Sequence, residues 1–420
     1  MSGGPRGHRM AAVDAQFYWM SAAIPSDQFL LYAFAGVPAD LDGAVAQLAG
    51  RARQSPHLTQ RVEEAGALGY PRWVPAFDHI GGVRHRAPED SWAGCLDAVV
   101  GLTGDQLDVR AAPWRLHVFA PVHGIPGHRG AGTVAVLQVA HVLADGARAS
   151  ALAAWLFGRA APVAAVDTPG SRLQPGSLPW RAVVAARSHR RRDHDTRAGL
   201  LPPPVGDRPP LVTNNPPAGR RAVRTLVRRR AELNGPTVTV AVLSAVSAAL
   251  SGYLDEPCDS LGAEVPMAKA GVRLANNHFG NLRVGLYPGH DRAARMAAIA
   301  ADITNGRLRS GHPASVAADR AFAATPAALL RWGVEKFDPQ TRPVRVSGNT
   351  VVSSVYRGAP DLRFGEAPVL LTAGFPALSP AMSLTHGVHG IGETVVISVH
   401  AAESAINEID VYLRLLDASL

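Results

Sequence analysis

The stretch QVAHVLADGARAS, residues 138–150, decides how the rest of the chain is read. His141 ends an apolar run, Asp145 and Gly146 follow it, and a run of small residues typical of a helix comes next. An aspartate in front of a helix caps it by accepting hydrogen bonds from the first N–H groups. A glycine there leaves room for a backbone bend or for a ligand that approaches closely. From these residues alone, an ordinary strand-to-helix turn and a catalytic centre both stay open.

The hydrophobic pattern around this stretch predicts strands and helices in alternation. Two apolar runs over 114–122 and 132–141 are joined by a turn-rich segment, which is typical of a β-hairpin. Apolar residues at helical spacing follow at 147–158. The other expected elements are a short amphipathic segment over 14–20, helices over 40–54, from Thr237 to residue 254 and within 404–416, and strands over 349–358 and 393–402.

Length and composition indicate two globular domains. The chain has 420 residues, of which 47% are hydrophobic and 18% are charged, and a single core stops growing at about 250–300 residues. Prolines gather within 201–219, where they prevent a regular helix or strand. We therefore expect an N-terminal domain over 1–180 that carries the histidine stretch, a basic proline-rich linker over 181–219, and a C-terminal domain over 220–420.

The positive charge of the chain is concentrated in one segment. The formal net charge is +8, and residues 187–230 alone hold twelve arginines against three aspartates, with no Phe, Tyr or Trp. Nucleic-acid surfaces usually interleave aromatic side chains with basic ones, so no nucleic-acid partner is expected. The segment instead indicates contact with the phosphates of a cofactor or with an anionic membrane surface. A solvated, partly disordered linker is the alternative.

Other signatures of catalysis, metal binding or membrane insertion are missing from the sequence. There is no GxSxG nucleophile elbow and no HExxH pattern. His386 and His389 have no carboxylate at ligand spacing, so no metal site is predicted. The longest apolar stretch, 238–254, is interrupted by polar residues and is expected to be a buried core helix. Cys95 and Cys258 stand alone and no signal segment is visible, which predicts reduced thiols in the cytoplasm.

The pattern HxxxDG at a strand end is the signature of the superfamily of CoA-dependent acyltransferases and non-ribosomal peptide condensation domains. Four segments resemble one branch of it, the wax ester synthase/diacylglycerol acyltransferase-like family of actinobacteria. The first is MAAVDAQFYWM (10–20), which is similar to that family's LSPLDAAFLWME, and the second is LTGDQLDVRAAPWRLHVF (102–119), which is similar to its segment around PLW. The third is GPTVTVAVLSAVSAALSGYL (235–254), which is similar to its ATVNDVVLAAVAGALRRYL. The fourth is NNHFGNLRVGL (276–286), which is similar to its GNRFGAMRVPL. The order and spacing agree from residue 10 to the C-terminus.

The resemblance implies a fold and an activity. The fold is α/β, with two chloramphenicol-acetyltransferase-like sandwich domains, a crossover, and a tunnel between the domains. The activity is an O-acyltransferase that moves a fatty acyl group from acyl-CoA to a hydrophobic alcohol or diacylglycerol. Acyl-CoA is then a co-substrate, and no permanently bound cofactor is expected. The basic segment would hold the CoA phosphates or rest against an anionic membrane or lipid droplet, which implies a cytoplasmic protein peripheral to the inner membrane face.

The resemblance also implies roles for individual residues. His141 would be the general base that takes the proton of the acceptor hydroxyl, because an imidazole with an ordinary pKa near ~6.5 suits this role at neutral pH. Asp145 would serve the catalytic motif by orienting the turn through an arginine, without touching the substrate. The substrate-binding residues implied are Gly146, Thr239, Asn277, Ser353 and Ser354, and Pro113 with Trp114 forms a structural motif.

Three positions depart from the pattern of the family. Ala140 stands in place of the first histidine of HHxxxDG, Thr239-Val240 replaces an Asn-Asp pair, and SSVYRG (353–358) replaces SNVPGP. Two alternatives therefore stay open. One is a catalytically degenerate relative that binds acyl-CoA or lipid, and the other is an acyltransferase for a polyketide or peptide acceptor.

Overall fold

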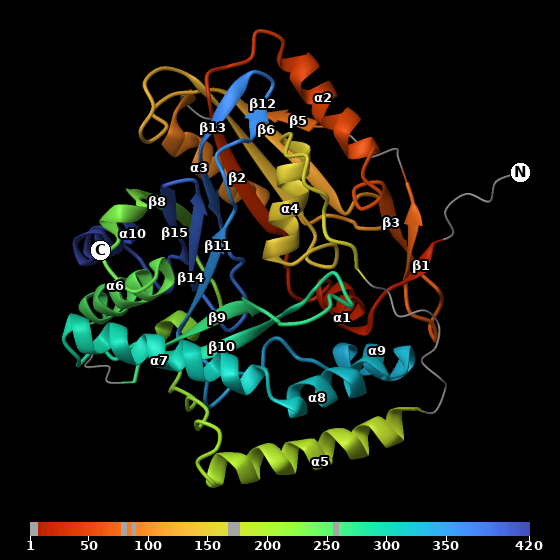
Figure 1. Cartoon of the computed structure of the whole chain (residues 1–420). Coiled ribbons are helices and arrows are strands. Elements are labelled where there is room, and N and C mark those ends of the chain that lie inside the picture. Colours follow the sequence, from red (N-terminus) through yellow and green to blue (C-terminus); the bar gives the residue numbers. More distant parts are fainter. Residues whose placement is uncertain (1–6, 77–81, 86–89, 167–176, 255–259) are drawn as a thin grey trace, which may run out of the picture.

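The computed structural model describes residues 7–76, 82–85, 90–166, 177–254 and 260–420. Two six-stranded sheets flanked by helices make up most of the molecule, and a three-stranded sheet lies beside the first of them (Figure 1). Each large sheet has its own apolar core. The expected α/β class, with two sheet-containing halves, is confirmed.

The first large sheet has the strand order β12-β13-β2-β7-β6-β5 and holds the histidine stretch at its centre. β7 (Gly132–Val139) pairs antiparallel with β6 (Trp114–Val122) in the predicted hairpin, and with β2 (Gln28–Ala35) on its other side. Every residue of β7 is buried. This explains why the strand is a continuous apolar run and does not alternate between apolar and polar residues.

Helices cover the first sheet on both faces. α2 (Leu41–Arg53) and α4 (Gly146–Leu156) pack against one face, and α3 (Trp92–Leu102) packs against the other. α2 and α4 occupy the two stretches predicted to be helical. The side chains of β2 alternate between the two cores, as the two-residue period of a strand requires.

The second large sheet has the strand order β10-β9-β11-β14-β15-β8. It packs against α6 (Val238–Tyr253), which begins where predicted because the Thr237 side chain accepts a hydrogen bond from the backbone N–H of Val240. The C-terminal helix α10 (Ile409–Ser419) lies on the same core and starts later in its predicted segment, after Glu408. The strands are β8 (Arg221–Arg229), β9 (Gly262–Ala268), β10 (Phe279–Gly285), β11 (Thr350–Tyr356), β14 (Leu384–Ile391) and β15 (Thr394–Ala402).

Two strands cross from the second half of the sequence into the first sheet. β13 (Ala367–Gly374) pairs antiparallel with β2, and β12 (Arg363–Phe364) pairs with β13 at the sheet edge. Residues of the range 220–420 therefore complete the sheet of the N-terminal half. This is the crossover that the resemblance implied, and it interlocks the two halves.

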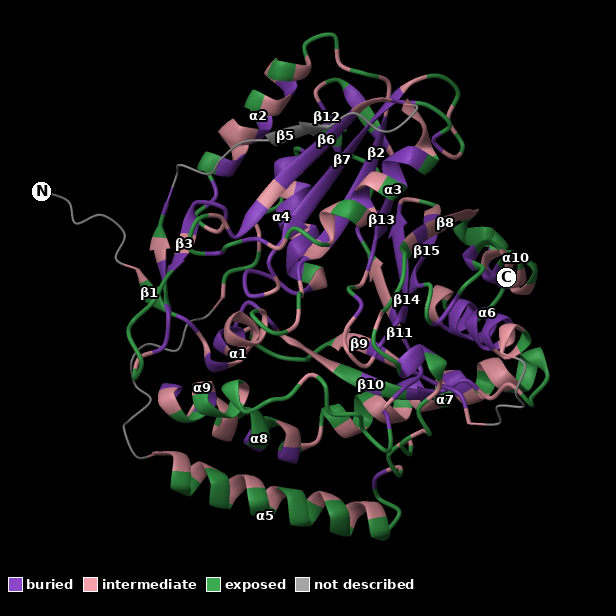
Figure 2. Ribbon diagram, turned by 180° about the vertical axis from the view of Figure 1, so that it is seen from behind, coloured by how far each residue is buried: buried purple, intermediate pink, exposed green. Residues whose placement is uncertain are grey.

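A helix occupies much of the segment predicted as a basic proline-rich linker, residues 181–219. α5 (Ser177–Arg197) runs for 21 residues along α8 (Pro313–Ala323) on the outside of the molecule (Figures 1 and 2). Arginine and alanine are good helix formers, and the proline cluster begins only after Gly199, where φ is +72°. The lack of regular structure was expected only where the prolines gather, within 201–219, and α5 ends before that range. No helix was predicted in the first part of the segment, and the positive charge is divided between α5 and the edge strand β8.

Of the two cysteines, Cys95 is buried and unpaired in α3, whereas Cys258 lies outside the described residues. Among the parts of the chain that the structure describes, no helix is both long and apolar enough to span a bilayer.

The remaining elements frame the two halves. They are β1 (His8–Arg9), α1 (Ala12–Met20), β3 (Gln60–Glu63), β4 (Arg72–Pro75), β5 (Gly82–His85), α7 (Arg292–Ser310) and α9 (Ala327–Glu335).

Candidate active site

His141 lies in the turn between β7 and α4, and its ring meets aromatic rings from both halves of the molecule. The ring stacks on Phe17 of α1, with 4.3 Å between the centroids and 5° between the planes. Phe279, the first residue of β10, lies 5.6 Å from the imidazole. The imidazole is half-buried in this cluster, so both its position and its tilt are fixed by packing.

A hydrogen-bond network determines which nitrogen of His141 carries the proton. The Asn277 amide nitrogen donates to the carboxylate of Asp14 at 2.9 Å and to the backbone carbonyl of His141 at 2.8 Å. The amide oxygen of Asn277 therefore faces Nδ1 of His141, 2.8 Å away. Because this oxygen only accepts, Nδ1 carries the proton and donates it to Asn277. Nε2 keeps its lone pair and has no hydrogen-bond partner among the residues that the structure describes.

Burial favours the neutral form of this imidazole. Desolvation lowers the pKa of His141 below its ordinary value, and the hydrogen bond to Asn277 and the charge of Asp145 oppose this only in part. The neutral form of the imidazole is thus favoured at neutral pH. A neutral ring with a free Nε2 has the properties of a general base.

Asp14 is a member of the site that the sequence reasoning did not single out. Its carboxylate is buried in α1 and accepts hydrogen bonds from the backbone N–H groups of Asn276 and Asn277, both at 2.9 Å, as well as from the Asn277 side chain. Burial raises the pKa of Asp14 to about 6, against the effect of these hydrogen bonds. The sequence did hold a signal for Asp14, because it lies in MAAVDAQFYWM and matches the aspartate of the family's LSPLDAAFLWME. The hydrogen-bond partners of Asp14, however, lie far away in the sequence.

Asp145 holds the turn together and makes no hydrogen bond to the ring of His141 within the described part of the chain. Its carboxylate caps α4 by accepting from the backbone N–H of Arg148 at 2.9 Å, and it also accepts from the N–H of His278 at 2.9 Å. It forms an ion pair with Arg273, with Nη1 and Oδ2 2.8 Å apart. Burial alone would raise the pKa of Asp145, but the hydrogen bonds from Arg273 and the two N–H groups outweigh burial and leave it below its usual value.

The segment around Pro113 and Trp114 supports the same turn through a backbone hydrogen bond. The carbonyl of Pro113 accepts a hydrogen bond from the backbone N–H of Ala140, at 3.0 Å, directly before His141. The buried Trp114 ring donates from Nε1 to the carbonyl of Leu58 at 2.9 Å. The residues expected to form a structural motif therefore lie next to His141.

The other residues proposed from the resemblance lie on or beside β11. Thr239, at the start of α6, donates to the hydroxyl of Ser354 at 2.9 Å. Ser353 is the neighbour of Ser354 on β11, so the two side chains point to opposite faces of the strand. A Cβ at Gly146 would lie 3.6 Å from Val355 of the same strand, an ordinary contact distance. Among the described residues, none of these side chains forms a hydrogen bond with His141.

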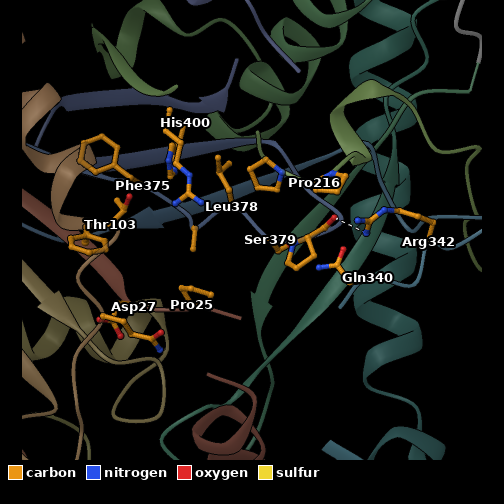
Figure 3. A pocket seen from close by; sticks show the side chains of 16 residues that line it. Pro25, Asp27, Thr103, Pro216, Gln340, Arg342, Phe375, Leu378, Ser379 and His400 are labelled. Carbon is orange, nitrogen blue, oxygen red and sulfur yellow. Dashed lines mark hydrogen bonds between the residues drawn. The ribbon is translucent and has the colours of Figure 1, made fainter. Parts of the chain in front are cut away.

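A cavity of about 190 Å³ lies between the two halves near the start of β2 (Figure 3). Gln28 lies between the lining residues Asp27 and Phe29 but does not line the cavity, and its side chain donates to the carbonyl of Ala144 in the His141 turn. His400 also lines the cavity, and burial lowers its pKa to about 4. Further lining residues include Thr103, Arg221, Arg342, Phe375 and Leu378.

The histidine pair of β14 does not form a metal cluster. His386 is buried, and its two ring nitrogens lie 2.9 Å from the hydroxyls of Thr350 and Tyr412. His389 is buried beside Arg357, and desolvation followed by the charge of Arg357 lowers the pKa of its ring well below the usual value. In the described ranges, no group of three or more His, Cys, Asp or Glu side chains is placed to hold a metal ion.

No known family model matches the sequence, and no curated protein matches it. Solved structures match over nearly the whole chain. The wax ester synthase/diacylglycerol acyltransferase from Marinobacter aquaeolei VT8 is 18% identical, with 98% of this chain and 97% of that one covered and a TM-score of 0.61. The first condensation domain of the CDA synthetase is 16% identical, with coverage of 99% and 97% and a TM-score of 0.59. A variant of the starter condensation domain of rhizomide synthetase, in complex with C8-CoA, is 14% identical, with coverage of 98% and 94% and a TM-score of 0.57.

These likenesses extend across both halves of the molecule and the crossover between them. The chain therefore has the two-domain, chloramphenicol-acetyltransferase-like fold that wax ester synthases and peptide condensation domains share.

Proposed function

We propose that this protein is an O-acyltransferase that moves a fatty acyl group from acyl-CoA to a hydrophobic alcohol or diacylglycerol. The observation that carries the proposal is the geometry of His141, whose Nδ1 lies 2.8 Å from the amide oxygen of Asn277 and whose Nε2 has no hydrogen-bond partner among the described residues. Burial lowers the pKa of the ring, which favours the neutral imidazole that a base requires. The fold adds support, because relatives with this architecture include an acyltransferase and a domain seen in complex with C8-CoA.

The proposed step is a direct transfer with His141 as the base. Nε2 takes the proton of the acceptor hydroxyl while the hydroxyl oxygen bonds to the thioester carbonyl carbon. The tetrahedral intermediate then collapses, the carbon–sulfur bond breaks, and the same proton passes from Nε2 to the leaving sulfur. The products are an ester and free CoA, and no acyl-enzyme forms. While Nε2 is protonated, the ring is cationic, and Asn277 with the carboxylate of Asp14 behind it stabilises that charge.

Other residues have supporting roles in this proposal. Asp145 positions the turn through Arg273 and the α4 cap and does not touch the substrate. Thr239 and Ser354 share one hydrogen bond, so one hydroxyl hydrogen of the pair is left to donate to an oxyanion. We assign Gly146 and Ser353 to substrate contact on β11 and the start of α4. We assign Asn277 to positioning of His141, which differs from the substrate contact expected from the resemblance.

CoA release from palmitoyl-CoA in the presence of long-chain alcohols and diacylglycerol tests the proposal. We expect release that requires the acceptor, and a loss of at least about 10²-fold in kcat for His141→Ala, the usual contribution of a general base. His123→Ala, which changes an exposed histidine, is the matched control and should leave the rate unchanged. A thermal melt of each variant verifies folding. Equal release by the wild type and His141→Ala would refute the assignment.

A second candidate is a relative that binds acyl-CoA or lipid without turnover. Thr239-Val240 in place of an Asn-Asp pair favours it, since a side-chain amide is lost from α6. It predicts saturable binding of palmitoyl-CoA in calorimetry that survives in His141→Ala, with no CoA release from either protein. An acceptor on a peptide or polyketide is the remaining alternative, and it predicts release only when such an acceptor replaces the lipid alcohol.

A further inference from the structure

The cavity of about 190 Å³ between the two halves has a wall from each of them (Figure 3). The first half supplies the start of β2 and the segment after α3, and the second half supplies parts of β8, β15 and the segment after β13. Neither His141 nor its partners Asp14 and Asn277 line the cavity. Pockets for drug-sized ligands measure about 300–1,000 Å³, so an occupant of this cavity must be small.

The buried part of the wall holds two hydrogen-bond acceptors that lack a donor. Asp27 is 6% exposed, and its Oδ2 accepts from the backbone N–H of Leu107 and from the side chain of Gln138, both at 2.8 Å. Its Oδ1 forms no hydrogen bond within the described part of the chain. His400 is 2% exposed and lies on the other wall (Figure 3). Its Nδ1 donates to the carbonyl of Pro376 at 3.0 Å, so Nε2 is an acceptor, and it too has no partner among the described residues.

The exposed part of the wall holds a donor that lacks an acceptor. Arg221, the first residue of β8, is exposed, and its side chain forms no hydrogen bond or ion pair within the described ranges. Burial and, to a smaller extent, the charge of Arg221 lower the pKa of His400 to about 4, so the two side chains are neighbours. Arg342 lines the cavity as well, but it already donates to the carbonyls of Pro339 and Pro380. Arg221 is therefore the lining arginine that is available to an anion.

Apolar side chains cover much of the wall between these polar groups. Phe29 follows Asp27 at a spacing of two residues, and Phe375 and Leu378 come from the segment after β13. All three are buried. An apolar wall with a few convergent polar groups is typical of a small-molecule site, and here the apolar part suits a short aliphatic chain.

We propose that this cavity binds a small free amino acid with an aliphatic chain, its ammonium group at Asp27 and its carboxylate at Arg221. An ammonium group has three donors and no acceptor, and a carboxylate only accepts. Each end of the ligand thus satisfies the groups that the chain leaves without partners. Hydrogen bonds in which donor and acceptor are ionised are also the strong ones.

The charges of the wall favour a ligand with two charged ends over one with a single charge. An amine alone would leave Arg221 without an anion, and a carboxylate alone would bring a second negative charge toward Asp27. Burial raises the pKa of Asp27, and an ammonium group beside it favours the ionised carboxylate again. Because no residue of the His141 network takes part, the proposal stands or falls independently of the proposed acyl transfer.

Calorimetric titration of the full chain tests the proposal with three probes, namely L-leucine, 4-aminobutyrate and 6-aminohexanoate. We expect saturable binding of at least one of them, with one molecule bound per chain. Hexanoate and hexylamine each lack one charged end of 6-aminohexanoate. Either one should bind at least about tenfold more weakly than the zwitterion that binds best, because it loses hydrogen bonds to a charged group.

Two substitutions test the two ends of the site. Asp27→Asn keeps an oxygen for Leu107 and Gln138, since both donate to Oδ2, and replaces only the free Oδ1. It should weaken binding at least about tenfold, whereas Asp105→Asn, at an exposed carboxylate that does not line the cavity, should not. Arg221→Gln should weaken binding to a similar extent. Its control is Arg220→Gln, at the exposed neighbouring position outside the cavity wall.

Thermal melts verify that every variant is folded and give a second readout. The zwitterion that binds should raise the melting temperature of the wild type and of the two controls more than that of Asp27→Asn or Arg221→Gln. The proposal is overturned if none of the three zwitterions binds at concentrations up to about 10 mM. It is also overturned if hexanoate or hexylamine binds as tightly as the best zwitterion, or if either Asp27→Asn or Arg221→Gln binds like the wild type.

Discussion

At the scale of single residues, the pKa of His141 governs the pH dependence expected of the proposed reaction. The base must be unprotonated, so kcat/KM rises with pH through the pKa of the imidazole. Burial lowers this pKa from its ordinary value of 6.5. The acid limb of a pH–kcat/KM profile should therefore have its midpoint below pH 6.5, and the rate should be constant from there to pH 8. A midpoint at or above pH 7 would contradict the assignment.

Asn277→Ala separates a positioning role from a merely structural one. The hydrogen bond to Asn277 raises the pKa of His141 against the effect of burial, so its loss should move the acid limb to lower pH. The plateau rate should fall at least about tenfold, because Nδ1 no longer has an acceptor that fixes the tautomer. Asn281→Ala, an exposed asparagine on the same strand as Phe279, is the control and should move neither quantity.

At this scale the sequence reveals only part of the site. The HxxxDG pattern locates His141 and Asp145 because both lie in one local turn. The contact of Asp14 with Asn277 joins residues 263 positions apart, and no local pattern predicts which of the buried carboxylates and amides will meet. The resemblance drew attention to the segments that hold both residues, but it did not pair them.

At the scale of secondary-structure elements, the two aspartate caps of α4 and α7 provide a matched pair of substitutions. Asp145 caps α4 and also neutralises Arg273, while Asp291 caps α7 by accepting from Ala294 and is exposed. Asp291→Ala should lower the free energy of unfolding by about 1 kcal/mol, the usual value of a cap. Asp145→Ala should lower it by about 3–5 kcal/mol, because an unpaired guanidinium is left in a buried turn.

Chemical denaturation of the two variants and the wild type measures this difference. Equal losses of stability in Asp145→Ala and Asp291→Ala would mean that the ion pair with Arg273 adds nothing beyond the cap. Such a result would contradict the proposed role of Asp145 in holding the turn.

The elements that were predicted correctly are those with a local cause. The β6–β7 hairpin follows from two apolar runs around a turn, and α6 begins at Thr237 because a threonine side chain caps it. α5 was missed because it buries no residue, so it lacks the apolar periodicity from which a helix is recognised. The pairing of β13 with β2 could not be predicted either, since strand partners far apart in the sequence are chosen by the whole fold.

At the scale of the whole molecule, the crossover should make the two halves unfold together. The first sheet needs β13, and the cores on its two faces contain Phe364 and Leu371, respectively, from the second half. A fragment of residues 1–219 should therefore show no cooperative thermal transition in circular dichroism, while the full chain should show one. Two well-separated transitions in the full chain, or a cooperative melt of the fragment, would contradict this expectation.

Because of the same crossover, β2 is synthesised long before its partner strand β13. The hydroxyl of Thr372 in β13 donates to the carbonyl of Leu31 in β2, 341 residues earlier in the chain. At bacterial and eukaryotic translation speeds of about 5–20 residues per second, the edge of β2 waits roughly 20–70 s for its partner to be synthesised. During that time a long apolar strand is open to wrong partners. The nascent protein should thus require a chaperone that keeps the unpaired strand from aggregating. Slow codons before residue 367 should lower the yield of folded protein, because they lengthen the time for which β2 is unpaired.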